Sequence, residues 1–87
     1  MKIRMRPIRV TSWSDEEGKV TPMRFEVAKK SGNIVKVRVE EILEQYETRT
    51  SGQLTRNYLC RTEVDDTSVQ YELAFELSTI RWYLSKW

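Results

Sequence analysis

The sequence of 87 residues contains no histidine and only one cysteine, Cys60. Without histidine the chain cannot form a Ser-His-Asp triad, a Cys-His dyad or a histidine-ligated metal site. A single thiol cannot form an intrachain disulfide, a thiolate zinc site or a CxxC redox pair. We therefore expect no metal, no cofactor and a buried, unreactive thiol. A chain without disulfides is typical of a reducing compartment, so the expected location is the cytoplasm.

Glycine and proline are also scarce, with three and two residues respectively. This leaves no GxGxxG, Walker or GxSxG motif, so the sequence contains no recognisable phosphate loop or nucleophile elbow. No apolar run is long enough to span a bilayer, and no apolar stretch of signal-peptide type follows the basic start. We therefore expect no contact with a membrane.

What the sequence does contain is a period of two in its apolar residues, which is the pattern of half-buried β-strands. The clearest alternation lies in three segments, 23–28, 35–40 and 70–77, with weaker runs at 8–10, 54–64 and 82–84. Their expected inward residues are Met23, Phe25, Val27, Val35, Val37, Val39, Tyr71, Leu73, Phe75, Leu77, Trp82 and Leu84. Turn-forming segments separate these runs. The sequence predicts one all-β domain over 1–87, an antiparallel meander of six to seven strands curled into a small barrel or roll.

Residues 39–46 allow two interpretations. Val39, Ile42, Leu43 and Tyr46 have helical spacing, which would give a single helical turn. Alternatively, a strand bends near Glu41, and a bulge there moves the inward positions from odd to even numbers. The hairpins expected on both sides favour the bent strand.

Several short motifs resemble a group of short, uncharacterised bacterial all-β proteins. They are Gly18–Pro22 leading into a strand, Val39–Leu43, Tyr58–Cys60, Tyr71–Phe75 and Trp82–Leu84. The resemblance covers residues 18–84 and implies a fold and a bacterial source. It implies no chemistry, because that group has no established activity. The basic start of the chain has no place in the group's pattern.

Charge is unevenly distributed along the chain. Residues 1–39 contain ten Lys and Arg against four Asp and Glu, whereas residues 40–87 contain five against nine. We expect antiparallel pairing between the two halves to neutralise much of this difference.

Two groups of residues are candidates for binding. The first is the basic start with a neighbouring turn, which suits a nucleic-acid backbone: Lys2, Arg4, Arg6, Arg9, Lys29 and Lys30. The alternative for the basic start is an edge strand that charge protects from aggregation. The second group is Tyr83 and Trp87, expected opposite Trp82 and therefore available for a protein interface or for a second small core.

No catalytic residues are predicted. Glu72 and Glu76 share one strand face, but four residues of strand place them about 13 Å apart, too far for a glycosidase pair. We expect both on an exposed face. The leading hypothesis is a non-catalytic binding or assembly module, acting on an unknown protein partner or on a second copy as a homodimer. The alternative is a small-barrel nucleic-acid-binding protein, which requires positive charge and exposed aromatic side chains on one surface.

Overall fold

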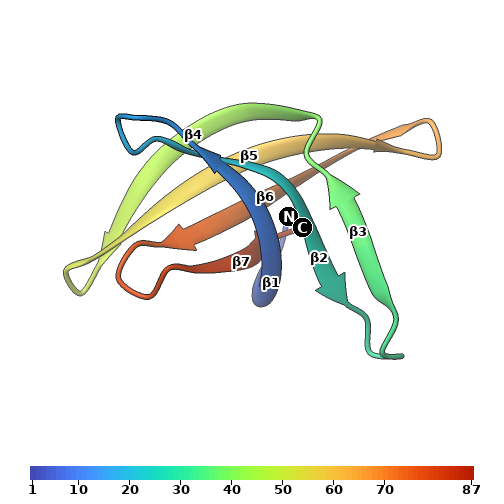
Figure 1. Ribbon diagram of the computed structural model, residues 1–87. Coiled ribbons are helices and arrows are strands. Elements are labelled where there is room, and N and C mark those ends of the chain that lie inside the picture. The colour runs from blue at the N-terminus through green and yellow to red at the C-terminus, as the bar shows by residue number, and fades with distance from the viewer.

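The computed structural model describes residues 1–87 as seven antiparallel strands of one sheet (Figure 1). The strands are β1 (Ile3–Ser14), β2 (Val20–Ala28), β3 (Ile34–Arg38), β4 (Glu41–Thr50), β5 (Gln53–Val64), β6 (Thr67–Glu76) and β7 (Arg81–Lys86). Their order across the sheet is β3-β2-β1-β7-β6-β5-β4. The all-β class and the number of strands agree with the prediction. No helix long and apolar enough to cross a lipid bilayer is present.

The first strand lies in the middle of the strand order, where it pairs with two neighbouring strands, β2 and β7. Residues 3–8 of β1 pair with β7, and residues 9–14 pair with β2. Pro7 therefore lies inside β1. It is tolerated because the pairing with β2 begins only at Arg9, so the missing amide proton removes no ladder bond there. Residues 3–8 therefore have a strand on one side only and form a local edge, which agrees in part with the edge-strand alternative for the basic start.

Residues 34–50 form two strands separated by a bend at Val39 and Glu40. The Val39 amide donates to the Met23 carbonyl on β2, while the Glu40 amide donates to the Arg61 carbonyl on β5. The bent strand is thus confirmed and the helical turn is wrong. A register shift at Leu43 follows the bend. Accordingly Val39 and then Ile42 pack against the core, which is the expected change from odd to even positions.

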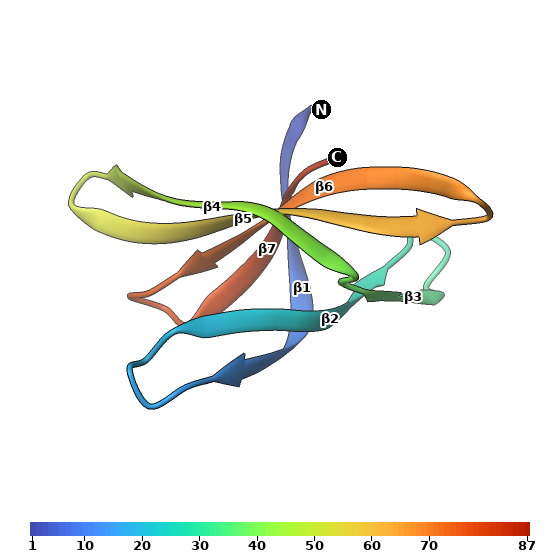
Figure 2. The ribbon, with the colours of Figure 1, turned by 90° about the horizontal axis from the view of Figure 1, so that it is seen from above.

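The sheet curls so that β2 and β3 face β4, β5 and β6 across the core, with β1 and β7 joining the two sides (Figures 1 and 2). The sheet ends at β3 on one side and at β4 on the other, and it is not closed into a barrel. Contacts across the curl include the rings of Phe25 and Tyr71, whose centroids are 5.4 Å apart. The Tyr58 hydroxyl also donates to the Val20 carbonyl at 2.8 Å, which ties the β1–β2 hairpin to β5.

Most of the expected inward residues are in the core. Phe25, Tyr71, Leu73, Phe75, Trp82 and Leu84 are buried, and Val27, Val37, Val39 and Leu77 pack against them. Val35 is half-buried and lies outside the core cluster, and Met23 has 49% of its surface exposed. The pairing of β1 with β2 skips Met23, so this residue bulges out and Pro22 is buried in its place.

Candidate nucleic-acid interface

The outward side of β1, β2 and β3 carries a cluster of cationic side chains. One row across the three strands is Arg9, Glu26 and Lys36, and the next is Thr11, Arg24 and Arg38. The row between them, Val10, Phe25 and Val37, points into the core, which places both charged rows on the outer face. We call the four cations Arg9, Arg24, Lys36 and Arg38 the basic face.

Arg24 and Arg38 lie directly opposite each other on neighbouring strands. Directly opposed like charges destabilise a sheet, because their Cβ atoms are only about 4.5–5.5 Å apart. Neither guanidinium forms an ion pair, and Glu26 contacts neither Arg9 nor Lys36 within ion-pair distance. The basic face therefore contains positive charge that the protein itself does not compensate.

The expected neutralisation between the two halves of the chain is wrong. All ion pairs lie within β4–β7, where Arg56 contacts Glu47, Arg61 contacts Glu41 and Glu63, and Lys86 contacts Glu72. The strand order explains this outcome. Only β1 and β7 join the basic and acidic halves, so β2 and β3 have no acidic strand beside them.

The surface around the basic face is slightly hollowed and partly apolar. A depression of about 460 Å³ is lined by Met23, Arg24, Lys36, Val37 and Arg38. Trp13, on the outward side of β1 two residues beyond Thr11, has 62% of its surface exposed. Positive charge and an exposed aromatic ring thus occur on one side of the sheet.

The structure divides the basic residues that the sequence had grouped. Arg9 belongs to the basic face, and Lys29 and Lys30 are exposed at the β2–β3 turn. That turn is closed by Gly32, whose φ of 90° suits a residue without a side chain.

The remaining three basic residues do not form a free arm. The Lys2 backbone exchanges two hydrogen bonds with Trp87, and the Arg4 guanidinium carbon lies 4.7 Å from the centroid of the Trp87 ring. Arg6 donates a hydrogen bond to the Ala28 carbonyl at the end of β2. Lys2, Arg4 and Arg6 therefore fix the start of β1 to the sheet.

Tyr83 and Trp87 do not share a face, contrary to their expected positions. Tyr83 lies opposite Pro7 on the outer side and is half-buried. The pairing of β6 with β7 skips Ser85, and this bulge turns Trp87 towards the core, against which it packs. A combined aromatic interface of these two residues is therefore not formed.

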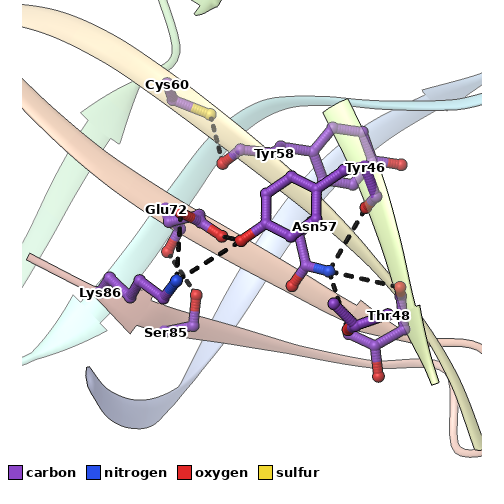
Figure 3. A network of polar contacts seen from close by, with 9 residues as sticks. Tyr46, Thr48, Asn57, Tyr58, Cys60, Glu72, Ser85 and Lys86 are labelled. Carbon is purple, nitrogen blue, oxygen red and sulfur yellow. Dashed lines mark hydrogen bonds and ion pairs between the residues drawn. The ribbon is translucent and has the colours of Figure 1, made fainter. Parts of the chain in front are cut away.

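Glu72 is buried and not exposed as expected, with 4% of its surface accessible. Tyr46 on β4 donates a hydrogen bond to one carboxylate oxygen, and the Lys86 Nζ lies 3.7 Å from the other (Figure 3). The hydrogen bond to Glu72 raises the pKa of Tyr46. The hydrogen bond to Tyr46 and the Glu72 charge raise the pKa of Lys86.

Because both pKa values are raised, Tyr46 and Lys86 stay protonated at neutral pH and neither is activated as a base. The cluster holds β4, β6 and β7 together. Asn57 adds hydrogen bonds to the Tyr46 carbonyl and to the Thr48 hydroxyl (Figure 3).

Cys60 is fully buried, which confirms the first part of its prediction. Burial, together with the negative charge of Glu72, raises the pKa of the thiol to about 12. No group of three or more Cys, Asp and Glu side chains lies close enough together to hold a metal ion.

Sequence reasoning did not identify Arg24, Lys36, Arg38 or Trp13 as candidate binding residues. A signal was present, because the first three occupy the outward positions of two alternating segments joined by a short turn. Trp13 gave no such signal, since it lies in a segment without clear alternation.

No family model matches the chain, and comparisons with curated proteins and with solved structures return no match.

Proposed function

We propose that the chain is a non-catalytic binding module that holds the phosphate backbone of a nucleic acid on the basic face. The observation that carries this proposal is the opposed pair Arg24 and Arg38, which lacks any acidic neighbour within ion-pair distance. A phosphate between the two guanidinium groups replaces repulsion by charge-assisted hydrogen bonds. In this proposal the curled sheet is a small barrel-like scaffold, and the protein acts in the cytoplasm, where Cys60 stays reduced.

The proposal predicts a salt-dependent affinity. Each neutralised phosphate releases a counterion, so four cationic contacts give a slope of about −2.8 in log K against log salt for a single strand. Replacing Arg24→Gln and Arg38→Gln together should reduce the slope to about −1.4. The measurement is the fluorescence anisotropy of a labelled oligonucleotide at several salt concentrations.

A matched control removes the same charge from the other half of the sheet. Arg49→Gln with Arg61→Gln changes two exposed or partly exposed guanidinium groups of β4 and β5. This pair should leave the slope unchanged. The proposal is wrong if the parent protein does not bind at about 50 mM salt, where such contacts are strong, or if the control weakens binding equally.

The charge on the two sheet edges favours a second candidate, self-association. The edge strand β3 carries Lys36 and Arg38, whereas the edge strand β4 carries Glu41, Glu44 and Glu47. Edge strands with free backbone groups pair readily with another chain. Pairing β3 with β3 or β4 with β4 would oppose like charges, so we propose that β3 of one copy pairs with β4 of another.

Sedimentation velocity over a range of protein concentrations tests this second candidate. Assembly should increase with concentration and should be lost when Glu44→Lys and Glu47→Lys reverse the charge of β4. A monomer at every concentration would show that the two edges do not pair.

A further inference from the structure

Trp13 is the only one of three tryptophans that does not pack against the core. Trp82 is buried and stacks on Phe75 with 4.7 Å between ring centroids, and Trp87 packs beside the core under Arg4. An indole left in water forgoes the burial that stabilises the other two. Its exposure is therefore more consistent with a contact to a ligand than with a role in folding.

The indole lies on the same side of the sheet as the opposed arginines. Thr11 is directly opposite Arg24, and Trp13 is two residues further along β1 on the same face. Two residues of strand cover about 6.6 Å, and neighbouring strands are about 4.8 Å apart. A base on the Trp13 ring and a phosphate on Arg24 and Arg38 are thus within the reach of one or two nucleotides.

The turn that follows Trp13 limits the path of such a ligand. Glu16 and Glu17 are exposed at the tip of the β1–β2 hairpin, whereas Lys29 and Lys30 are exposed at the opposite end of β2. Phosphates are repelled from the first turn and attracted towards the second. The backbone of the ligand is therefore expected to run from the basic face towards the β2–β3 turn, with a base left at Trp13.

We propose that Trp13 stacks on a base and that the basic face consequently binds single-stranded nucleic acid in preference to duplex. This inference rests on the function proposed above. In a duplex the bases are already paired and stacked, so no base is available to the indole, whereas in a single strand every base has a free face. Stacking tolerates any sequence, so we expect little sequence preference.

The test uses three labelled probes: an oligothymidine of about ten nucleotides, which is within the site size of small β-domains, an abasic strand of equal length, and a duplex. Trp13→Ala should lower the affinity for oligothymidine by about 5- to 150-fold, the range for loss of one stacked base. Trp13→Phe keeps an aromatic ring and should therefore retain part of the affinity for oligothymidine. Binding to the abasic strand should be the same for all three proteins.

Two controls separate this inference from the proposed function. Val64→Ala removes an exposed apolar side chain from β5, away from the basic face, and should leave all affinities unchanged. Arg24→Gln with Arg38→Gln should weaken binding to every probe that binds. Because Trp13 is exposed, its variants should keep the parent's thermal midpoint, which shows that the fold is retained.

The outcomes are distinguishable. Arginine-dependent binding that is equal for oligothymidine, abasic strand and duplex, and unchanged in Trp13→Ala, overturns the stacking inference but leaves the proposed function standing. Such a result would assign Trp13 to a protein contact, for which exposed tryptophan is also suited. If no probe binds in an arginine-dependent manner, the proposed function fails and the inference fails with it.

Discussion

In β4–β7, Arg56 lies opposite Glu47 and Arg61 opposite Glu41, whereas in β1–β3 Arg24 lies opposite Arg38. The first half of the sheet thus keeps its positive charge free, whereas in the second half three of the five cations, Arg56, Arg61 and Lys86, form ion pairs with carboxylates of the same half. Both halves enclose the same core, since Phe25 of β2 contacts Tyr71 of β6. The difference therefore concerns the outer surface and not the core, and it identifies the half in which positive charge is available to a ligand.

The largest expected effect tests whether the two halves share one core. Phe25→Ala in β2 and Leu73→Ala in β6 should each lower the free energy of unfolding by about 2–5 kcal/mol, because each leaves a cavity among buried side chains. Denaturant titrations followed by tryptophan fluorescence and by circular dichroism should give coincident transitions for both variants. Separate transitions after Phe25→Ala would show that the halves are independent units.

A smaller loss is expected from the cluster of Tyr46, Glu72 and Lys86, which only β4–β7 contains and in which Glu72 alone is buried. Tyr46→Phe removes the hydroxyl that donates to the Glu72 carboxylate and should cost roughly 1.5–3 kcal/mol, the range for a hydrogen bond to a charged group. Tyr83→Phe is the control, because the Tyr83 hydroxyl has no hydrogen-bond partner within the protein. This substitution should therefore change stability little. Stability is measured by urea titration. Equal losses for the two variants would show that the hydrogen bond from Tyr46 to Glu72 does not stabilise the fold.

The stability should also depend on pH, because Cys60 on β5 and Tyr71 on β6 are buried ionisable groups of the core. The unfolded thiol of Cys60 ionises near its ordinary pKa of about 8.5, whereas the native thiol keeps its proton to about 12. The native state then binds more protons than the unfolded state, so stability falls as pH rises from about 9 towards 12.

Cys60→Ala should flatten this alkaline decline by at most about 1.4 kcal/mol per pH unit, the value for one proton. Part of the decline should remain, because burial also raises the pKa of Tyr71 to about 12. Urea titrations at several alkaline pH values measure the slope. A slope that Cys60→Ala leaves unchanged would mean that the thiol ionises in the native state, and rapid alkylation of the folded protein would then be expected.

The smallest effect concerns the outer surface itself. Arg38→Glu converts a like-charged pair into an oppositely charged pair and should raise the free energy of unfolding by roughly 0.2–1 kcal/mol. The same change should weaken nucleic-acid binding. The mirror variant, Glu47→Arg, converts the ion pair with Arg56 into a like-charged pair and should lower stability by a similar amount. A loss in both variants would contradict the view that Arg24 and Arg38 repel each other.

The strands themselves could be predicted from the sequence because alternation is a local property. Tyr71, Leu73 and Phe75 occupy the core as their spacing indicates, and the bend after Val39 could be inferred from a change of parity. The bulges at Met23 and Ser85 could not be predicted, because nothing in the local sequence marks them. Each bulge reverses the faces of the residues beyond it, which is why Met23 and Trp87 were assigned to the wrong sides.

The basic face was missed for a different reason. Whether charges meet their opposites depends on which strands become neighbours, and that is decided by the pairing of β1 with β7, between residues about 75–85 positions apart. Composition alone favoured neutralisation between the halves. The strand order instead keeps β2 and β3 away from the acidic strands, and this separation is visible only once the sheet is assembled.

The central position of β1 also affects how the protein forms during synthesis. The β1–β2 hairpin can pair as soon as residue 28 leaves the ribosome, but residues 3–8 have no partner until β7 has followed. For most of translation residues 3–8 therefore have no strand beside them, and unpaired strand segments invite pairing with other chains. The last strand to be made completes the pairing of the first, so the tertiary structure is finished only after the emergence of residues 81–86.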